Sequence, residues 1–207
     1  MSRSDHYPAP VPGPQRILVY GVTGSGKTTL ALELGRRLRL PVHLADDEIG
    51  WLPGWVEVEA AEQCRRAARI VEQESWILDS AYSKWVDLVL ARVDLVVGLD
   101  YTRWRSLGRL LVRTVRRITH KQLVCNGNVE TWRGLIGENS VIAWHFRSFR
   151  RKRARMRAWA ADPTGPPVVL LRSPRETDQW LAKITSGRES SPPSVDDVAR
   201  DQRDHDG

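Results

Sequence analysis

The chain has 207 residues, of which 41% are hydrophobic and 28% charged, so it resembles an ordinary globular domain with room for a core. No apolar run approaches the roughly 20 residues that span a bilayer, and residues 1–14 lack the apolar segment of a secretory signal. Only Cys64 and Cys125 are present, far apart, which excludes a zinc-finger spacing and a disulfide framework. We therefore expect a cytoplasmic protein with no membrane partner.

The net charge of +7 is distributed unevenly. Between Arg103 and Arg157 there are 15 basic residues and two acidic ones, whereas the rest of the chain is acidic on balance. A region of this charge attracts phosphorylated small molecules or nucleic acid, and both alternatives stay open at this point.

The most specific motif begins at Gly21. Residues 21–28 read GVTGSGKT, which fits the phosphate-binding pattern G-x-x-x-x-G-K-[ST] at each fixed position. The apolar run 17–20 predicts a buried strand before the motif, and leucines spaced by four from Leu30 predict a helix after it. This order favours a true P-loop over a chance match, because the loop N–H groups and the helix dipole then both point at a phosphate.

The motif predicts which residues hold ATP and Mg²⁺. The Lys27 ammonium can contact the β- and γ-phosphates and stabilise negative charge on them, and the Thr28 hydroxyl is a typical Mg²⁺ ligand. The residues expected to bind the nucleotide are Gly21, Thr23, Gly24, Ser25, Gly26, Lys27, Thr28 and Thr29.

The rest of the chain alternates between predicted strands and helices. Strands are expected at 42–44, 76–79, 95–100 and 168–171, and helices at 57–73, 83–91, 103–118, 139–160 and 174–185. This order predicts an α/β fold, a three-layer P-loop NTPase domain over residues 15–186 with a five-stranded parallel sheet.

Three segments fall outside this alternation. Residues 1–14 and the acidic tail 187–207 have few apolar residues, and we expect both to be disordered. Residues 119–138 are polar and contain glycines, so we expect a helical lid insert that closes over ATP; a plain surface loop is the alternative.

Carboxylates follow two of the predicted strands, where parallel sheets bind their ligands. Asp79 ends the strand 76–79, and we expect it to assist Thr28 in holding Mg²⁺; an exposed strand-end residue is the alternative. Asp46 and Asp47 follow the strand 42–44. We expect Asp47 to orient or deprotonate the hydroxyl of an acceptor, with helix capping as the alternative.

The predicted helix 103–118 carries a stripe of arginines. Arg105, Arg109, Arg113 and Arg116 share one face because of their spacing. Phosphoryl transfer needs positive charge on the equatorial oxygens, so we expect Arg109, Arg113 and Arg117 to act in catalysis. A solvated basic face is the alternative.

Two further features have open interpretations. Residues 147–157 hold seven basic side chains, more than one triphosphate needs, and form either a nucleic-acid surface or the outer face of a helix beside the lid. Trp51 and Trp55 flank a Pro-Gly turn, and either face a planar acceptor or pack the loop onto the body.

Taken together, these segments resemble the adenylate-kinase-like P-loop kinases, and within them the bacterial topology modulation (FlaR-like) proteins. The matching segments lie within residues 15–185 and include D-x-x-x-W-x-x-G-W from Asp47 and N-G-N-x-E-x-W-R from Asn126. The group usually has Asp-Gly-Asn-Tyr where this chain has residues 79–82, Asp-Ser-Ala-Tyr. The resemblance implies a five-stranded core, a hinged lid, ATP–Mg²⁺ in the P-loop and an acceptor beneath the arginines.

The sequence therefore predicts a monomeric ATP-dependent kinase that moves the γ-phosphoryl group to a small acceptor, with a nucleotide or nucleoside as candidates. Two alternatives remain. One is an ATP-responsive nucleic-acid-binding regulator acting through 147–157, and the other is a stand-alone ATPase.

Overall fold

A five-stranded parallel sheet lies at the centre of the computed structural model, which describes residues 13–135 and 140–189. Its strand order is β2-β5-β1-β6-β9. The strands are β1 (Arg16–Gly21), β2 (Val42–His43), β5 (Trp76–Leu78), β6 (Leu95–Leu99) and β9 (Val168–Leu171). Leu18 in the middle strand pairs with Leu78 on one side and Val96 on the other, and all three are fully buried. Both faces of the sheet are covered, as the continuous apolar runs predict.

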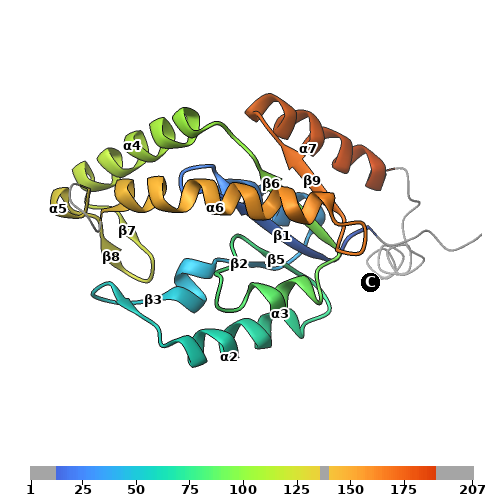
Figure 1. The fold of residues 1–207 in the computed structure, drawn as a ribbon, viewed down its shortest axis with the longest axis horizontal. Helices are drawn as coiled ribbons and strands as arrows, with labels where there is room; N and C mark the ends of the chain where they lie inside the picture. The colour runs from blue at the N-terminus through green and yellow to red at the C-terminus, as the bar shows by residue number, and fades with distance from the viewer. Residues whose placement is uncertain (1–12, 136–139, 190–207) are drawn as a thin grey trace, which may run out of the picture.

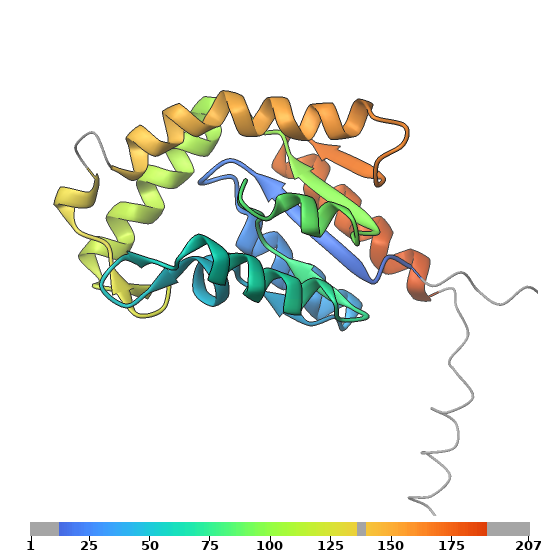
Figure 2. The same ribbon diagram turned by 60° about the horizontal axis from the view of Figure 1, so that its bottom comes forward.

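Helices cover the two faces of this sheet (Figures 1 and 2). On one face, α1 (Lys27–Leu38) and α7 (Pro174–Glu189) pack through Leu30, Leu34 and Leu181. On the other face, α2 (Ala60–Val71), α3 (Val86–Leu90) and α6 (Val141–Ala161) share a second core that contains Trp85 and Met156. The expected three-layer α/β architecture is confirmed.

Beyond the sheet, α4 (Arg103–Thr119) and the first half of α6 extend together toward α5 (Trp132–Leu135), as Figure 1 shows. Between α4 and α6 the chain forms a two-stranded hairpin, β7 (Leu123–Val124) with β8 (Asn128–Val129). The expected lid insert is therefore a hairpin followed by a short helix, and its residues 136–139 lie outside the described residues.

A second hairpin lies near the end of β2. The chain passes through a π-helical turn, η1 (Asp46–Gly50), and then pairs β3 (Trp51–Leu52) with β4 (Val56–Glu57). The hairpin turn needs left-handed backbone at Gly54 and Trp55, with φ of 81° and 57°. The helix expected from residue 57 begins only at Ala60, because β4 takes the preceding residues.

The ends of the described chain differ slightly from expectation. The helix expected to end at 185 continues to Glu189, three residues into the predicted tail. Most of the predicted leader, and residues 190–207 of the tail, lie outside the described residues. Within the described ranges no helix is both long and apolar enough to cross a membrane.

Candidate active site

The loop between β1 and α1 is held in a tight curl by its glycines and by α4. Gly24 and Gly26 have φ of 81° and 97°, which side chains disfavour. A Cβ on Gly24 would lie 2.8 Å from the Leu110 Cβ, and one on Gly26 would lie 2.8 Å from an Arg109 guanidinium nitrogen. The first turns of α4 therefore rest directly on the loop, and only glycine leaves room for them.

A buried histidine fixes the loop from a third element. His145 of α6 is fully buried, and its Nδ1 lies 3.0 Å from the Thr23 carbonyl oxygen. Its Nε2 lies 3.5 Å from the Ser106 hydroxyl of α4. Burial lowers the pKa of His145, so the neutral ring is favoured. The loop, α4 and α6 thus meet at one side chain.

Thr28 and Asp79 form the hydroxyl–carboxylate pair expected for Mg²⁺. The Thr28 hydroxyl donates to an Asp79 oxygen at 2.6 Å, and the Ala45 backbone N–H donates to the other oxygen at 2.9 Å. Burial raises the pKa of Asp79, although both hydrogen bonds lower it. The donor set, two hard oxygens at the end of a strand, fits Mg²⁺, and these residues would hold the ion.

Lys27 projects from the same loop. Its ammonium donates to the Val22 carbonyl oxygen at 3.2 Å. Burial lowers its pKa, while the carboxylates of Asp79 and Asp46 raise it. The positive charge therefore stands between the loop and the two carboxylates.

A cavity of about 1190 Å³ opens at the carboxyl ends of the strands. Of the residues expected at the site, those that line it are Thr23, Gly24, Lys27, Thr28, Asp47, Asp79, Arg113 and Arg117. Gly21, Ser25, Gly26 and Thr29 do not line it; Gly21 and Ser25 are buried and Thr29 is exposed. The expected residues thus gather at one place, with the P-loop at one end of the cavity.

The stripe of arginines on α4 divides between two surfaces. Arg113 and Arg117 face the cavity, and Arg117 pairs with Glu130 of the insert at 3.0 Å. The Arg113 Nε is buried and has no hydrogen-bond partner among the described residues. Arg109 does not line the cavity; it lies against Gly26 and lines a second pocket with Arg116. Arg113 and Arg117 line this second pocket as well as the cavity, so they lie between the two.

The carboxylates after β2 have different partners. Asp47 accepts a hydrogen bond from the Asn126 backbone N–H at 2.9 Å. Asp46 accepts one from the Tyr82 hydroxyl, and burial together with Asp46 raises the pKa of Tyr82. Both line the cavity, but only Asp46 acts on the pKa of Lys27. Asp46 is therefore a second carboxylate of the cavity, for which the sequence predicted no role of its own.

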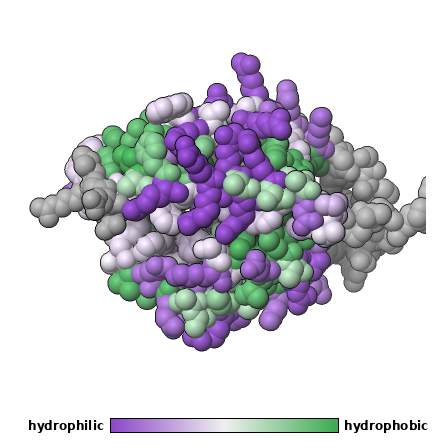
Figure 3. Space-filling view, in the orientation of Figure 1, coloured by the Kyte–Doolittle hydropathy of each residue, from purple (hydrophilic) through white to green (hydrophobic). Residues whose placement is uncertain are grey.

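The basic run 147–157 is not one surface. Arg147, Arg151, Lys152 and Arg155 line the cavity, whereas Arg153 and Arg157 bind the buried carboxylate of Asp100 at the end of β6. The spacing i, i+4, i+8 of 147, 151 and 155 was the signal that could have identified the cavity side. Hydrophilic side chains gather across the middle of the face in Figure 3, where α6 lies.

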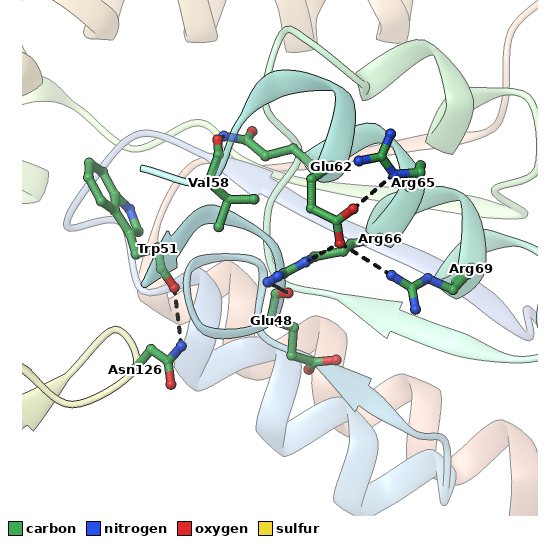
Figure 4. A network of polar contacts seen from close by, with 9 residues as sticks. Glu48, Trp51, Val58, Glu62, Arg65, Arg66, Arg69 and Asn126 are labelled. Atoms are coloured by element: carbon green, nitrogen blue, oxygen red, sulfur yellow. Dashed lines mark hydrogen bonds and ion pairs between the residues drawn. The ribbon is translucent and has the colours of Figure 1, made fainter. Parts of the chain in front are cut away.

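The two hairpins hydrogen-bond to each other across the cavity. The Asn128 side chain accepts from the Trp55 N–H at 2.7 Å and donates to the Leu52 carbonyl at 3.0 Å. Asn126 donates to the Trp51 carbonyl at 3.2 Å (Figure 4), and the Trp55 indole donates to the Val129 carbonyl at 3.1 Å. We call these contacts between residues 51–55 and 126–129 the clasp. The two tryptophans line the cavity and also contact the insert, so the packing role of their loop is observed and the contact with a planar acceptor stays a prediction.

A polar network behind the clasp fixes η1. Arg66 of α2 donates to the Glu48 carbonyl at 3.2 Å and pairs with Glu62 at 2.9 Å, as Figure 4 shows. Helix α2 thereby holds the turn that carries Asp46 and Asp47.

Comparison with known proteins agrees with this architecture. A shikimate kinase from Bacteroides thetaiotaomicron superposes with a TM-score of 0.51 at 14% identity, over 86% of this chain and 99% of that chain. The chain has a P-loop NTPase fold. A gluconokinase from Sinorhizobium meliloti 1021 aligns over 85% of this chain and 96% of that chain, at 15% identity and a TM-score of 0.48. A deoxyadenosine kinase from M. mycoides aligns over 84% of this chain and 98% of that chain, at 14% identity and a TM-score of 0.48.

No protein-family model matches the chain, and no curated protein matches it either. The resemblance to the topology modulation proteins therefore rests on the sequence motifs alone. The two motifs that begin at Asp47 and at Asn126 contain the residues of the clasp.

Proposed function

We propose that the chain is an ATP-dependent phosphotransferase that moves the γ-phosphoryl group of ATP to a hydroxyl of a small acceptor. The observation that carries the proposal is the contact between Thr28 and Asp79, 2.6 Å long, beside Lys27 at the end of a large cavity. A P-loop alone would suit any nucleotide-binding protein. A hydroxyl–carboxylate pair in a cavity of about 1190 Å³, which η1 and α6 also line, suits transfer to another molecule.

The residues would divide the work as follows. The N–H groups of the loop and the start of α1 would hold the phosphates of ATP, and Mg²⁺, when bound by Thr28 and Asp79, would neutralise charge on them. Lys27 and Arg113 would stabilise the charge that develops on the transferred group. Arg109, at Gly26, and Arg117 would support them from α4.

The acceptor side would be formed by η1 and the residues after β5. An acceptor oxygen would bond to the γ-phosphorus as the bond to the β–γ bridging oxygen breaks, and ADP would leave. The hydroxyl proton would pass to a carboxylate. Asp47 is the proton acceptor expected from the sequence, and its contact with Asn126 would orient it. Asp46, whose charge acts on Lys27, is the second candidate for this role.

The insert would act as a lid. Its hairpin already contacts the acceptor-side hairpin through the clasp, so closure over ATP would also enclose the acceptor. We include the kinship with the topology modulation group, and a nucleotide or nucleoside as acceptor, in this proposal.

A nucleic-acid regulator is the weaker candidate. Of the seven basic residues in 147–157, only Arg150 neither lines the cavity nor pairs with Asp100. A surface divided in this way offers no continuous track for a phosphate backbone.

Binding of a non-hydrolysable ATP analogue with Mg²⁺ tests the proposal. We expect Lys27→Ala to weaken binding by at least about tenfold, since charge-assisted contacts of this kind contribute about 1.5–3 kcal/mol. Lys183→Ala, an exposed lysine of α7, is the matched control and should bind normally. Equal affinities of the Lys27→Ala variant and the wild type would refute the assigned site.

A further inference from the structure

One wall of the cavity carries four cations that the proposed handling of ATP does not use. Arg147, Arg151 and Arg155 lie four residues apart on α6, and Lys152 lies beside them. None of the four forms an ion pair with any residue in 13–135 or 140–189. The neighbouring Arg153 and Arg157, which face away from the cavity lining, are both neutralised by Asp100.

Four of the five carboxylates that line the cavity have partners outside this wall, whereas the fifth, Asp46, accepts from the Tyr82 hydroxyl and also acts on Lys152. Glu57 pairs with Lys84 and Glu130 with Arg117. Asp79 is bound by Thr28 and by a backbone N–H, and Asp47 by the Asn126 N–H. Eight basic residues and five acidic ones line the cavity, so an excess of positive charge remains, and it lies on α6.

The wall lies toward the acceptor side of the cavity. The Lys152 ammonium lies 6.0 Å from the ring centre of Tyr20, and burial raises the pKa of the Tyr20 hydroxyl while the charge of Arg155 acts to lower it. Tyr20 belongs to the core on the α2 and α3 face of the sheet, opposite the α1 face on which the P-loop helix packs. That face also carries η1 with Asp46 and Asp47, because η1 packs on α2.

Lys27 and Lys152 lie close enough in this region for the charge of Lys27 to act on Lys152, and the carboxylate of Asp46 acts on both lysines. Burial, together with the nearby Lys27, lowers the pKa of Lys152 to about 7. Placing like charges together in a partly enclosed site costs free energy unless an anion binds between or beside them. Asp46 is one carboxylate against the four basic residues of the wall, so an excess of positive charge remains for a negative ligand.

We infer that the acceptor carries a phosphate monoester in addition to its reactive hydroxyl, and that Arg147, Arg151, Lys152 and Arg155 bind this phosphate. The inference rests on the proposed function and names the class of its second substrate. A phosphate monoester carries close to two negative charges at neutral pH and has three acceptor oxygens, which matches a set of guanidinium forks and one ammonium. A neutral nucleoside or sugar would leave all four cations unpaired.

The test fills the ATP site first. Protein saturated with Mg²⁺ and a non-hydrolysable ATP analogue is titrated calorimetrically with methyl phosphate, with acetate and with methanol. We expect saturable binding of methyl phosphate, weaker binding of acetate and none of methanol. In Arg151→Gln and Arg155→Gln the dissociation constant for methyl phosphate should rise at least about tenfold each. Arg150→Gln, on the same helix but outside the cavity lining, should match the wild type.

Several results would overturn the inference. If methyl phosphate binds only when the analogue is absent, it occupies the P-loop alone. If Arg151→Gln weakens the analogue and not methyl phosphate, the wall serves ATP. Acetate that binds as tightly as methyl phosphate would assign a carboxylate acceptor instead. Failure of the analogue to bind at all would overturn the proposed function, and this inference with it, whereas the other three results leave the proposed function standing.

Discussion

The contact between Thr28 and Asp79 decides where a metal ion would sit. Thr28 follows the P-loop lysine, and Asp79 ends a buried strand 51 residues later along the chain. The two meet because β1 and β5 are parallel neighbours, so their carboxyl ends lie at the same edge. The Asp79 carboxylate is anchored by a second hydrogen bond from Ala45, which leaves its position little freedom.

Replacement of this carboxylate should act through Mg²⁺. Asp79→Asn removes a negative charge but retains the shape and one acceptor oxygen, so we expect ATP turnover to require at least about tenfold more Mg²⁺. A Mg²⁺ titration of turnover measures this, with Asp87→Asn, an exposed residue of α3, as control. An unchanged Mg²⁺ requirement would remove Asp79 from the metal site.

Lys152 should make stability depend on pH. Its pKa is about 7 in the folded protein, against an ordinary value near 10.5, because burial and Lys27 disfavour the charged form. Between about pH 7 and pH 9 the unfolded chain therefore binds more protons, and the free energy of unfolding should rise with pH. Lys152→Met should reduce this slope by up to about 1.4 kcal/mol per pH unit.

Urea unfolding at pH 7.0, 7.75 and 8.5 measures the two slopes. Lys27, whose pKa is also lowered, contributes a rise of its own in both proteins, so the difference between the slopes is the quantity to compare. If the free energy of unfolding changes equally with pH in the wild type and in Lys152→Met, the pKa of Lys152 in the folded protein is not lowered, and this prediction is wrong.

Among the elements, the two hairpins are joined to each other by the clasp. The buried Asn128 side chain bonds to Trp55 and to Leu52, so it joins the insert to the hairpin after η1. Asn128→Ala removes these bonds and leaves backbone groups without partners. We expect limited proteolysis within 119–135 to accelerate several-fold.

The same experiment should respond to nucleotide. A non-hydrolysable ATP analogue should protect residues 119–138 in the wild type, as a lid requires, and protect the Asn128→Ala variant less. Leu123→Ala, an exposed residue of the same insert, is the control. Identical cleavage with and without the analogue would make the insert a plain surface loop.

Helix α6 is anchored to the sheet by charge. Asp100 has a side chain 1% exposed, and Arg157 binds it at 2.7 Å while Arg153 binds its other oxygen. Asp100→Asn should lower the free energy of unfolding by about 1–3 kcal/mol, because two guanidinium groups lose their partner. Urea unfolding against Asp178→Asn, an exposed residue of α7, measures it. A change no larger than that of the control would show that the pairs do not stabilise the fold.

Sequence patterns predicted the long elements better than the short ones. The strands that pair as β1, β5, β6 and β9 are apolar runs, and burial on both faces of the sheet follows from that composition. The hairpin β7–β8 contains Asn126-Gly127, a strong turn signal, but its strands have two residues each and no periodicity to detect. Its pairing with residues 51–55 depends on side-chain hydrogen bonds between segments more than 70 residues apart.

Residues of the candidate site could be predicted where a sequence motif specifies both the residue type and its position at the end of a strand. Lys27, Thr28 and Asp79 meet as their positions after two parallel strands require. Lys152 and Arg155 were attributed to a basic run, because a count of charges does not tell which side of a helix faces a cavity. Arg109 was expected to act on phosphate, and it lies beside Gly26 of the P-loop; its role in catalysis stays a prediction.

For the whole molecule, the sheet, the P-loop and the two hairpins form a cavity. The P-loop residues Lys27 and Thr28 line it, five acidic residues line it as well, and α6 contributes four basic residues. The carboxylates and the basic residues of α6 line the same cavity, beside the carboxyl ends of the parallel strands. A phosphotransferase is the class of protein that needs a donor site and an acceptor site side by side.

The most direct test of this account is a ³¹P NMR measurement of ATP and Mg²⁺ with wild-type protein and a pool of nucleosides, nucleotides, sugars and sugar phosphates. We predict that the γ-phosphate resonance decreases as a new phosphate-ester resonance grows in equal amount, and that Lys27→Ala shows neither change. Release of inorganic phosphate alone would indicate an ATPase, and an unchanged spectrum would indicate a nucleotide-binding protein without catalysis; either result would contradict the account.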